Sequence, residues 1–174
     1  MMRKIFALLG LLALALPVAG VAGLRTGEGT LSVEDGNGRV TLLARGGVIG
    51  RLERGTVTIF DLTPEDANDP VVFGDDKPVR FIGETGIQYA GTSLRFRLVG
   101  GGFRIVITGR GIDLSVVAKG SGSIAAEGRV GDPGVYSLDG ADCRNVRSTC
   151  TPLPEYPRRF QLGGEKSLVR PAAD

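Results

Sequence analysis

The chain has 174 residues, including 28 glycines and no histidine or tryptophan, and its side chains carry a formal net charge of +2. Without histidine, it has no Ser-His or Cys-His nucleophile pair, no histidine general base and no ligand set for most catalytic zinc sites. A charge this close to zero also argues against bulk electrostatic binding of nucleic acid, which needs a basic surface with many phosphate contacts.

Residues 1–22 have the pattern of a secretory signal peptide. An Arg-Lys pair lies near the start, the apolar run 5–16 follows, and Pro17 leads into a stretch of small residues. We expect cleavage after Ala22 and delivery to the cell envelope or the medium. Cleavage removes two of the 21 basic side chains, so the remaining 19 balance the 19 acidic ones.

An uncleaved membrane anchor is the alternative to a signal peptide, because the apolar run extends toward Ala22 and approaches the roughly 20 residues of a bilayer span. Pro17, Gly20 and Gly23 favour cleavage, since they end a helix where a peptidase requires extended chain with small side chains. After cleavage we expect no stable membrane span.

Residues 23–162 predict a single all-β domain. Short runs of alternating apolar and polar residues are separated by glycines, which is typical of strands joined by tight turns. We therefore predict an antiparallel meander of about ten short strands that forms a sandwich or a barrel. In its clearest part, two glycine-rich joints (100–102 and 109–111) connect three runs that share one buried face. The residues expected on that face are Leu94, Phe96, Leu98, Phe103, Ile105, Ile107, Ile112, Leu114 and Val116.

Two segments of this domain, 42–46 and 116–120, resemble each other position by position. A duplicated β-unit would explain the resemblance. The general likeness of glycine-rich alternating strands explains it equally well, because a period seen only twice falls short of a repeat array.

Other segments depart from the alternation. Residues 63–66 predict a single helical turn, with threonine as N-cap and proline at the first helical position. Phe160 and Leu162 are expected in a last strand. We expect the tail, 163–174, to be disordered because it has little apolar content.

Cys143 and Cys150 are the only cysteines of the chain. We predict a disulfide between them, because an exported protein meets an oxidising environment. Free thiols are the alternative. A redox-active pair is disfavoured, since the Cys-X-X-Cys spacing is missing.

An acidic stretch lies between residues 61 and 76. Its oxygens are of the kind that calcium binds, but their spacing matches no defined calcium loop, so we interpret them as solvated loop carboxylates and predict no metal site. The stretch contains Asp61, Glu65, Asp66, Asn68, Asp69, Asp75 and Asp76.

Three arginines, Arg95, Arg97 and Arg104, are predicted to form an outward anion patch. If the strands on either side of 99–102 pair, Arg97 lies directly opposite Arg104, with Asp113 diagonal to Arg104. Like charges so placed are mildly destabilising, and an anion such as an acidic glycan or a wall polymer would relieve the repulsion. The alternative is a solvated face whose guanidinium groups diverge.

These features predict an exported all-β binding or structural module of the cell envelope, with an acidic envelope polysaccharide as its candidate partner. We predict no catalytic residue and no cofactor. A carboxylate-dependent hydrolase of the glycosidase kind is the first alternative, since two carboxylates facing each other across a cleft would suffice. A β-barrel carrier of an apolar ligand is the second. The candidate carboxylates of a hydrolase are Glu53, Asp61, Asp113 and Glu127.

The predicted signal peptide gives the first testable prediction. Protein recovered from the envelope or culture medium of the native host should have the mass of a chain that begins at Gly23, because the small residues before that position suit a signal peptidase. Intact-mass measurement checks this. Recovery of the full-length chain in the membrane fraction would contradict it.

Overall fold

The computed structural model describes residues 29–65, 69–75, 79–128, 131–163 and 169–170. The predicted leader and most of the predicted tail lie outside these ranges. In the described part, the protein is built almost entirely of antiparallel β-strands. The predicted all-β class is therefore confirmed.

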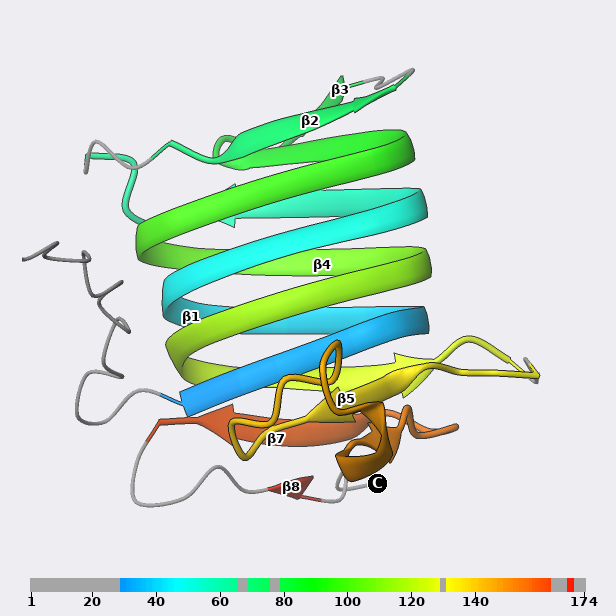
Figure 1. Cartoon of the computed structure of the whole chain (residues 1–174). Helices are drawn as coiled ribbons and strands as arrows, with labels where there is room; N and C mark the ends of the chain where they lie inside the picture. The colour runs from blue at the N-terminus through cyan, green and yellow to red at the C-terminus, as the bar shows by residue number, and fades with distance from the viewer. Residues whose placement is uncertain (1–28, 66–68, 76–78, 129–130, 164–168, 171–174) are drawn as a thin grey trace, which may run out of the picture.

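Two very long strands form most of the structure. β1 (Gly29–Asp61) and β4 (Gly86–Ala126) run antiparallel and wind together into a coil (Figure 1). Because of this winding, a residue of β1 has a β4 partner on each side: Val40 pairs with both Ile107 and Ile124. The part of β4 that leads from one of these partners to the other makes one full turn of the coil.

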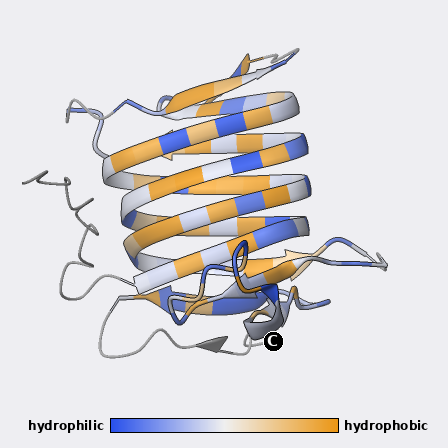
Figure 2. Ribbon diagram, in the orientation of Figure 1, coloured by the Kyte–Doolittle hydropathy of each residue, from blue (hydrophilic) through white to orange (hydrophobic). Residues whose placement is uncertain are grey.

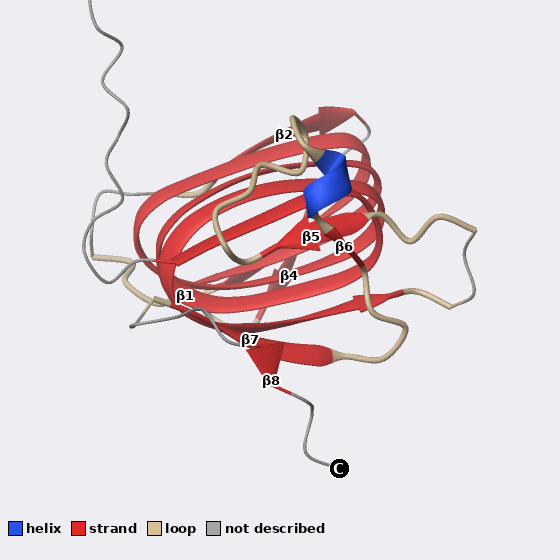
Figure 3. Cartoon of the chain, turned by 60° about the horizontal axis from the view of Figure 1, so that its bottom comes forward, coloured by secondary structure: helices blue, strands red, loops and turns tan. Residues whose placement is uncertain are grey.

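The coil is flattened, so each turn consists of two straight arms joined by two corners (Figure 3). The arms stack into two walls that face each other across the core. The first wall contains residues 30–36 and 47–54 of β1 with 92–99 and 110–117 of β4, and the second contains 39–45, 56–61, 86–90, 103–108 and 120–126.

Glycines at the corners allow the backbones of the two strands to approach closely. Gly46 and Gly120 have φ angles of 147° and 157°, which L side chains rarely adopt. A Cβ at Gly46 would lie 2.5 Å from the carbonyl oxygen of Val117, and one at Gly120 would lie 2.3 Å from that of Leu43. A larger residue at either position would therefore push the strands apart.

The same corner gives a physical reason for the resemblance between segments 42–46 and 116–120. They are antiparallel neighbours, with Ala44 paired to Gly120 and Gly46 paired to Ala118. Each segment thus places its alanine against the glycine of the other. Both segments need a glycine where the neighbouring backbone comes close, and this shared requirement explains their resemblance whether or not a unit was duplicated.

Short strands extend the sheet at both ends of the coil. At one end, β2 (Val71–Asp75) and β3 (Val79–Ile82) pair with β4. β2 continues the first wall, because it pairs with residues 92–97, and β3 continues the second, because it pairs with residues 86–89.

At the other end, β5 (Val135–Ser137) pairs with β1, and β7 (Arg158–Leu162) pairs with β4. β6 (Thr151–Pro152) and β8 (Val169–Arg170) extend the sheet beyond them. The 3-10 helix η1 (Arg147–Thr149) lies in the loop between β5 and β6.

Apolar side chains from both walls fill the inside of the coil. Hydrophobic and hydrophilic residues alternate along both long strands, so every second side chain points inward (Figure 2). All nine residues predicted for the buried face are at most 4% exposed, and they belong to one continuous core cluster. The predicted core is confirmed.

The predicted meander, in contrast, is wrong in its connections. The two glycine-rich joints are corners within one continuous strand and not hairpins between short strands. An arm of β1 lies between successive arms of β4, so Leu98 pairs with Val48, and Phe103 pairs with Ala44. Alternation fixes which face a residue occupies, but it does not identify the strand beside it.

Two further expectations have clear outcomes. β7 is the strand predicted around Phe160 and Leu162, and it buries both, but it is not the last one: β8, in the tail predicted to be disordered, pairs with it. At the predicted helical turn, Pro64 and Glu65 form a turn, and the last predicted residue, Asp66, lies outside the described residues.

Neighbouring glycines give a matched test of the corner. Gly46→Ala should lower the free energy of unfolding by about 1–3 kcal/mol, because alanine is strained at this φ and its Cβ meets backbone. At Gly47 the nearest atom to a new Cβ would be 3.9 Å away, so Gly47→Ala should change stability by less than about 0.5 kcal/mol. Urea unfolding of both variants measures the difference. Equal stabilities would contradict the role of the corner.

Candidate anion-binding site

The outward side chains of the first wall form rows that cross neighbouring strands. Residues in a row are successive cross-strand partners, whose Cβ atoms lie about 5 Å apart. Adjacent rows are two positions apart along each strand, since intervening side chains point into the core. Two rows matter here: Phe73–Arg95–Arg51–Asp113 and Val71–Arg97–Ile49–Ser115.

A hollow of about 380 Å³ lies between these rows, over the paired residues Gly50 and Phe96. We call it the arginine well. β1 and β4 supply the side chains around its floor, β2 supplies one from the edge of the wall, and the loop between β5 and β6 supplies another. The side chains that line it are Ile49, Arg51, Phe73, Arg95, Arg97 and Arg144.

The well is cationic, and most of its charge is not neutralised by the protein. Among the residues that the structure describes, the three ion pairs involve none of Arg95, Arg97 and Arg144. All three side chains are exposed. Their guanidinium groups are therefore free to bind an anion from solution.

Arg51 differs from these three because it has a carboxylate partner. Its Nε and Nη2 donate to Oδ2 of Asp113 at 2.9 and 2.5 Å. Asp113 is buried, and its Oδ1 accepts the backbone N–H of Asp35 at 3.0 Å. These bonds satisfy the carboxylate and hold Arg51 at the edge of the well.

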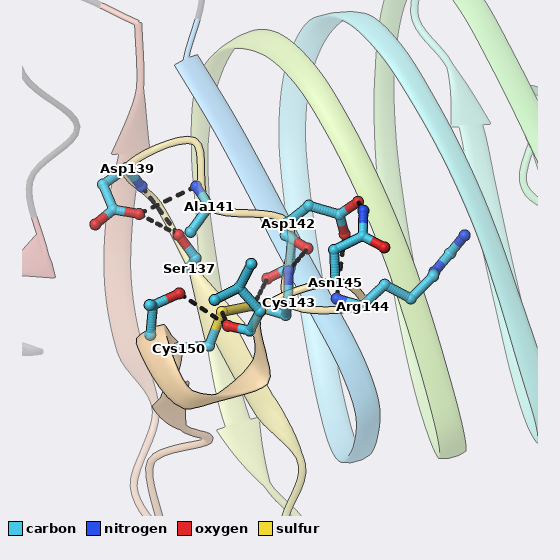
Figure 4. The surroundings of a disulfide bond; sticks show 11 residues. Ser137, Asp139, Ala141, Asp142, Cys143, Arg144, Asn145 and Cys150 are labelled. Atoms are coloured by element: carbon cyan, nitrogen blue, oxygen red, sulfur yellow. Dashed lines mark hydrogen bonds between the residues drawn. A yellow bond between two sulfur atoms is a disulfide. The ribbon is translucent and has the colours of Figure 1, made fainter.

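A disulfide-bonded loop supplies Arg144. The Cys143–Cys150 bridge joins Cα atoms 5.8 Å apart, which confirms the predicted disulfide. The backbone N–H of Cys143 donates to the Ser32 hydroxyl at 3.1 Å, so the loop lies against the first wall. Figure 4 shows the Arg144 side chain extending away from the disulfide.

A second arginine of the loop fixes it further. Arg147 donates to Asp35 at 2.9 Å and to Asp132 at 2.7 Å. Asp35 also contacts Asp113 through its backbone N–H, so the loop and the Arg51 ion pair belong to one network. The loop that carries Arg144 is therefore held by a disulfide and by two ion pairs.

Hydrogen bonds also order the chain just before the disulfide (Figure 4). Asp139 accepts the hydroxyl of Ser137 and the N–H of Ala141. The bond from Ser137 first, and then that from Ala141, hold the pKa of the Asp139 carboxyl below its ordinary value.

The structure brings together two of the three arginines predicted for the anion patch. Arg95 and Arg97 line the well, but Arg104 lies on the second wall, where it pairs with Leu43 and Phe60. Its guanidinium stacks over the Phe60 ring, 5.2 Å from the centroid. The predicted opposition of Arg97 and Arg104 is wrong, because the chain between them turns a corner instead of forming a hairpin.

The like-charge contact does exist, but between other residues. Arg51 and Arg95 are direct cross-strand partners, and Asp113 neutralises Arg51 and not Arg104. The outward position of Arg51 follows from its own alternating run. Its neighbour across the strands belongs to a distant part of the sequence, so local pattern gives no signal for the pairing.

Among the described residues of the acidic stretch, no three carboxylates gather as they would around a metal ion. Asp61 accepts the backbone N–H of Thr63 at 2.8 Å. With Asp69 and Tyr89 it lines a second hollow of about 230 Å³, and burial raises the pKa of the Tyr89 hydroxyl. Asp66, Asn68 and Asp76 lie outside the described residues.

The carboxylates considered for a hydrolase occupy separate places. Asp113 is bound to Arg51, Glu53 is exposed on the first wall, and Glu127 is exposed beyond the end of β4. Within the described ranges, the hollow that Asp61 shares with Asp69 contains none of the other three. The inside of the coil, where a carrier would hold an apolar ligand, is occupied by the core cluster.

Comparisons with family models, with curated proteins and with solved structures found no match for this chain. In the ranges described above, no helix has the length and apolar character needed to cross a membrane.

The disulfide loop generates a stability prediction. Cys143→Ser/Cys150→Ser should lower the free energy of unfolding by about 2–3 kcal/mol, because the short loop is then free in the unfolded chain. Denaturant unfolding measures the loss. Thiol labelling of the unfolded, unreduced wild type should find no free sulfhydryl, and two labelled cysteines would contradict the bridge.

Proposed function

We propose that this protein is an exported binding module whose arginine well holds the acidic groups of an anionic polymer, such as an acidic envelope polysaccharide. The observation that carries the proposal is the convergence of Arg95, Arg97 and Arg144 on one hollow, with none of them ion-paired to another described residue. Guanidinium groups bind carboxylate, sulfate and phosphate through charge-assisted hydrogen bonds.

The arrangement favours a bound anion over an empty site. Arg95 lies two positions from Arg97 on the same face of the wall, and its direct partner Arg51 is already paired with Asp113, so two unneutralised guanidinium groups share this face. Like charges at such positions repel each other. An acidic group between them replaces the repulsion by attraction.

The rigid wall and the anchored loop also favour binding. Three of the lining arginines extend from paired strands of the sheet, and the loop that carries Arg144 is held by a disulfide and two ion pairs. Little backbone has to be ordered when a ligand binds, so less of the binding free energy is lost.

The disulfide supports the export half of the proposal. Disulfides persist in oxidising compartments and are rare in the reducing cytosol. A binding module for a polymer of the envelope has to work on that side of the membrane.

A pull-down on immobilised polygalacturonate tests this function. Wild type should be retained at low salt and released as salt is raised, because exposed charges are screened. Arg95→Ser/Arg97→Ser should lose most of the binding and keep its fold, since both side chains are exposed. Thermal melts confirm that the fold is intact.

Arg104→Ser is the matched control for this experiment. It removes one arginine, where the double variant removes two, from the same strand but on the other wall. It should bind polygalacturonate like wild type. Equal binding by the double variant and the control would refute the proposed site.

A further inference from the structure

The arginine well is not purely cationic. Ile49 and Phe73 line it together with the arginines, and they are 57% and 66% exposed. Phe73 is the row neighbour of Arg95, and Ile49 is the row neighbour of Arg97. Each of these two arginines thus lies beside an apolar side chain that is left in contact with water.

Apolar exposure continues along the same wall. Val71 lies beyond Arg97 in its row, and Val99 and Val117 occupy the next row. These three valines are 38–48% exposed. Exposed apolar residues that are contiguous and surround a hollow are typical of a binding surface, whereas single ones are ordinary.

We infer that the well selects anions whose charged group is attached to a body with a flat apolar face. The arginines would bind the charged group, while Phe73 and Ile49 would cover the apolar face. This inference rests on the proposed function and defines the ligand class of the same site. It excludes ligands that offer charge alone, such as inorganic phosphate, as the preferred ligands.

The geometry allows both contacts at once. Phe73 enters from β2 at one edge of the wall, and Arg144 enters from the disulfide loop, which lies against β1 at Ser32. A ligand that lies across the Gly50–Phe96 floor can therefore meet the Phe73 ring and the guanidinium groups together. The volume of about 380 Å³ is within the range of pockets that hold small organic ligands.

Calorimetry with three probes tests this inference: 2-naphthyl phosphate, inorganic phosphate and neutral 2-naphthol. Wild type should bind 2-naphthyl phosphate about tenfold more tightly than inorganic phosphate, the gain expected from covering one face of the ring system. 2-Naphthol should bind more weakly than 2-naphthyl phosphate, because it lacks the charged group.

Phe73→Ser should bring the two phosphates to nearly equal affinity, while Arg97→Ser should weaken both. The matched control is Phe81→Ser on β3. Phe81 is 75% exposed, but β3 continues the second wall, and Phe81 does not line the well. This control should keep the tenfold preference.

The outcomes separate the inference from the function on which it rests. If polygalacturonate binds through Arg95 and Arg97 but the two phosphates bind wild type equally, or neither binds, the inference is overturned and the proposed function stands. If Phe73→Ser keeps the tenfold preference, the inference is also overturned. Loss of arginine-dependent binding to every anion would overturn both.

Discussion

The close approach of two backbones at the corners of the coil is the constraint on which the rest of the structure depends. At Gly46 and Gly120 a Cβ would lie within 2.5 Å of a carbonyl oxygen of the neighbouring strand. Without a side chain there, β1 and β4 can bend sharply and remain hydrogen-bonded through the bend. Two strands of this length can then wind around a core, so that along most of β1 each residue has a β4 partner on both sides.

Winding also determines what lies on the surface. Because each turn of the coil uses two arms and two corners, segments distant in sequence become neighbours in a wall, and their outward side chains form rows. The arginine well is a product of these rows: Arg51 comes from β1, Arg95 and Arg97 come from β4, and Phe73 comes from β2. The sheet's pleat separates the core below from the well above, so the outward side chains of the well can change without disturbing the packing beneath them.

The disulfide loop adds to the wall a group that strands alone do not provide. Arg144 reaches the well from outside the sheet, and Arg147 connects the loop to Asp35 beside the buried Asp113. Asp113 in turn holds Arg51. The stability of the wall and the placement of the arginines around the well therefore share one polar network, in which a buried carboxylate is satisfied by an arginine and a backbone N–H.

The sequence by itself determined the all-β class, the side chains that face the core and the pairing of the only two cysteines. The alternation around Leu94, Phe96 and Leu98 buries these residues whatever strand lies beside them, because side chains on a strand alternate between two faces. For the same reason the outward direction of Arg95 and Arg97 could be predicted. The tertiary structure decided which strands are neighbours. It separated Arg104 from Arg97, placed Arg51 opposite Arg95 and brought Phe73 and Arg144 to the well, since pairing across full turns of the coil depends on corner geometry and on contacts far apart in the chain.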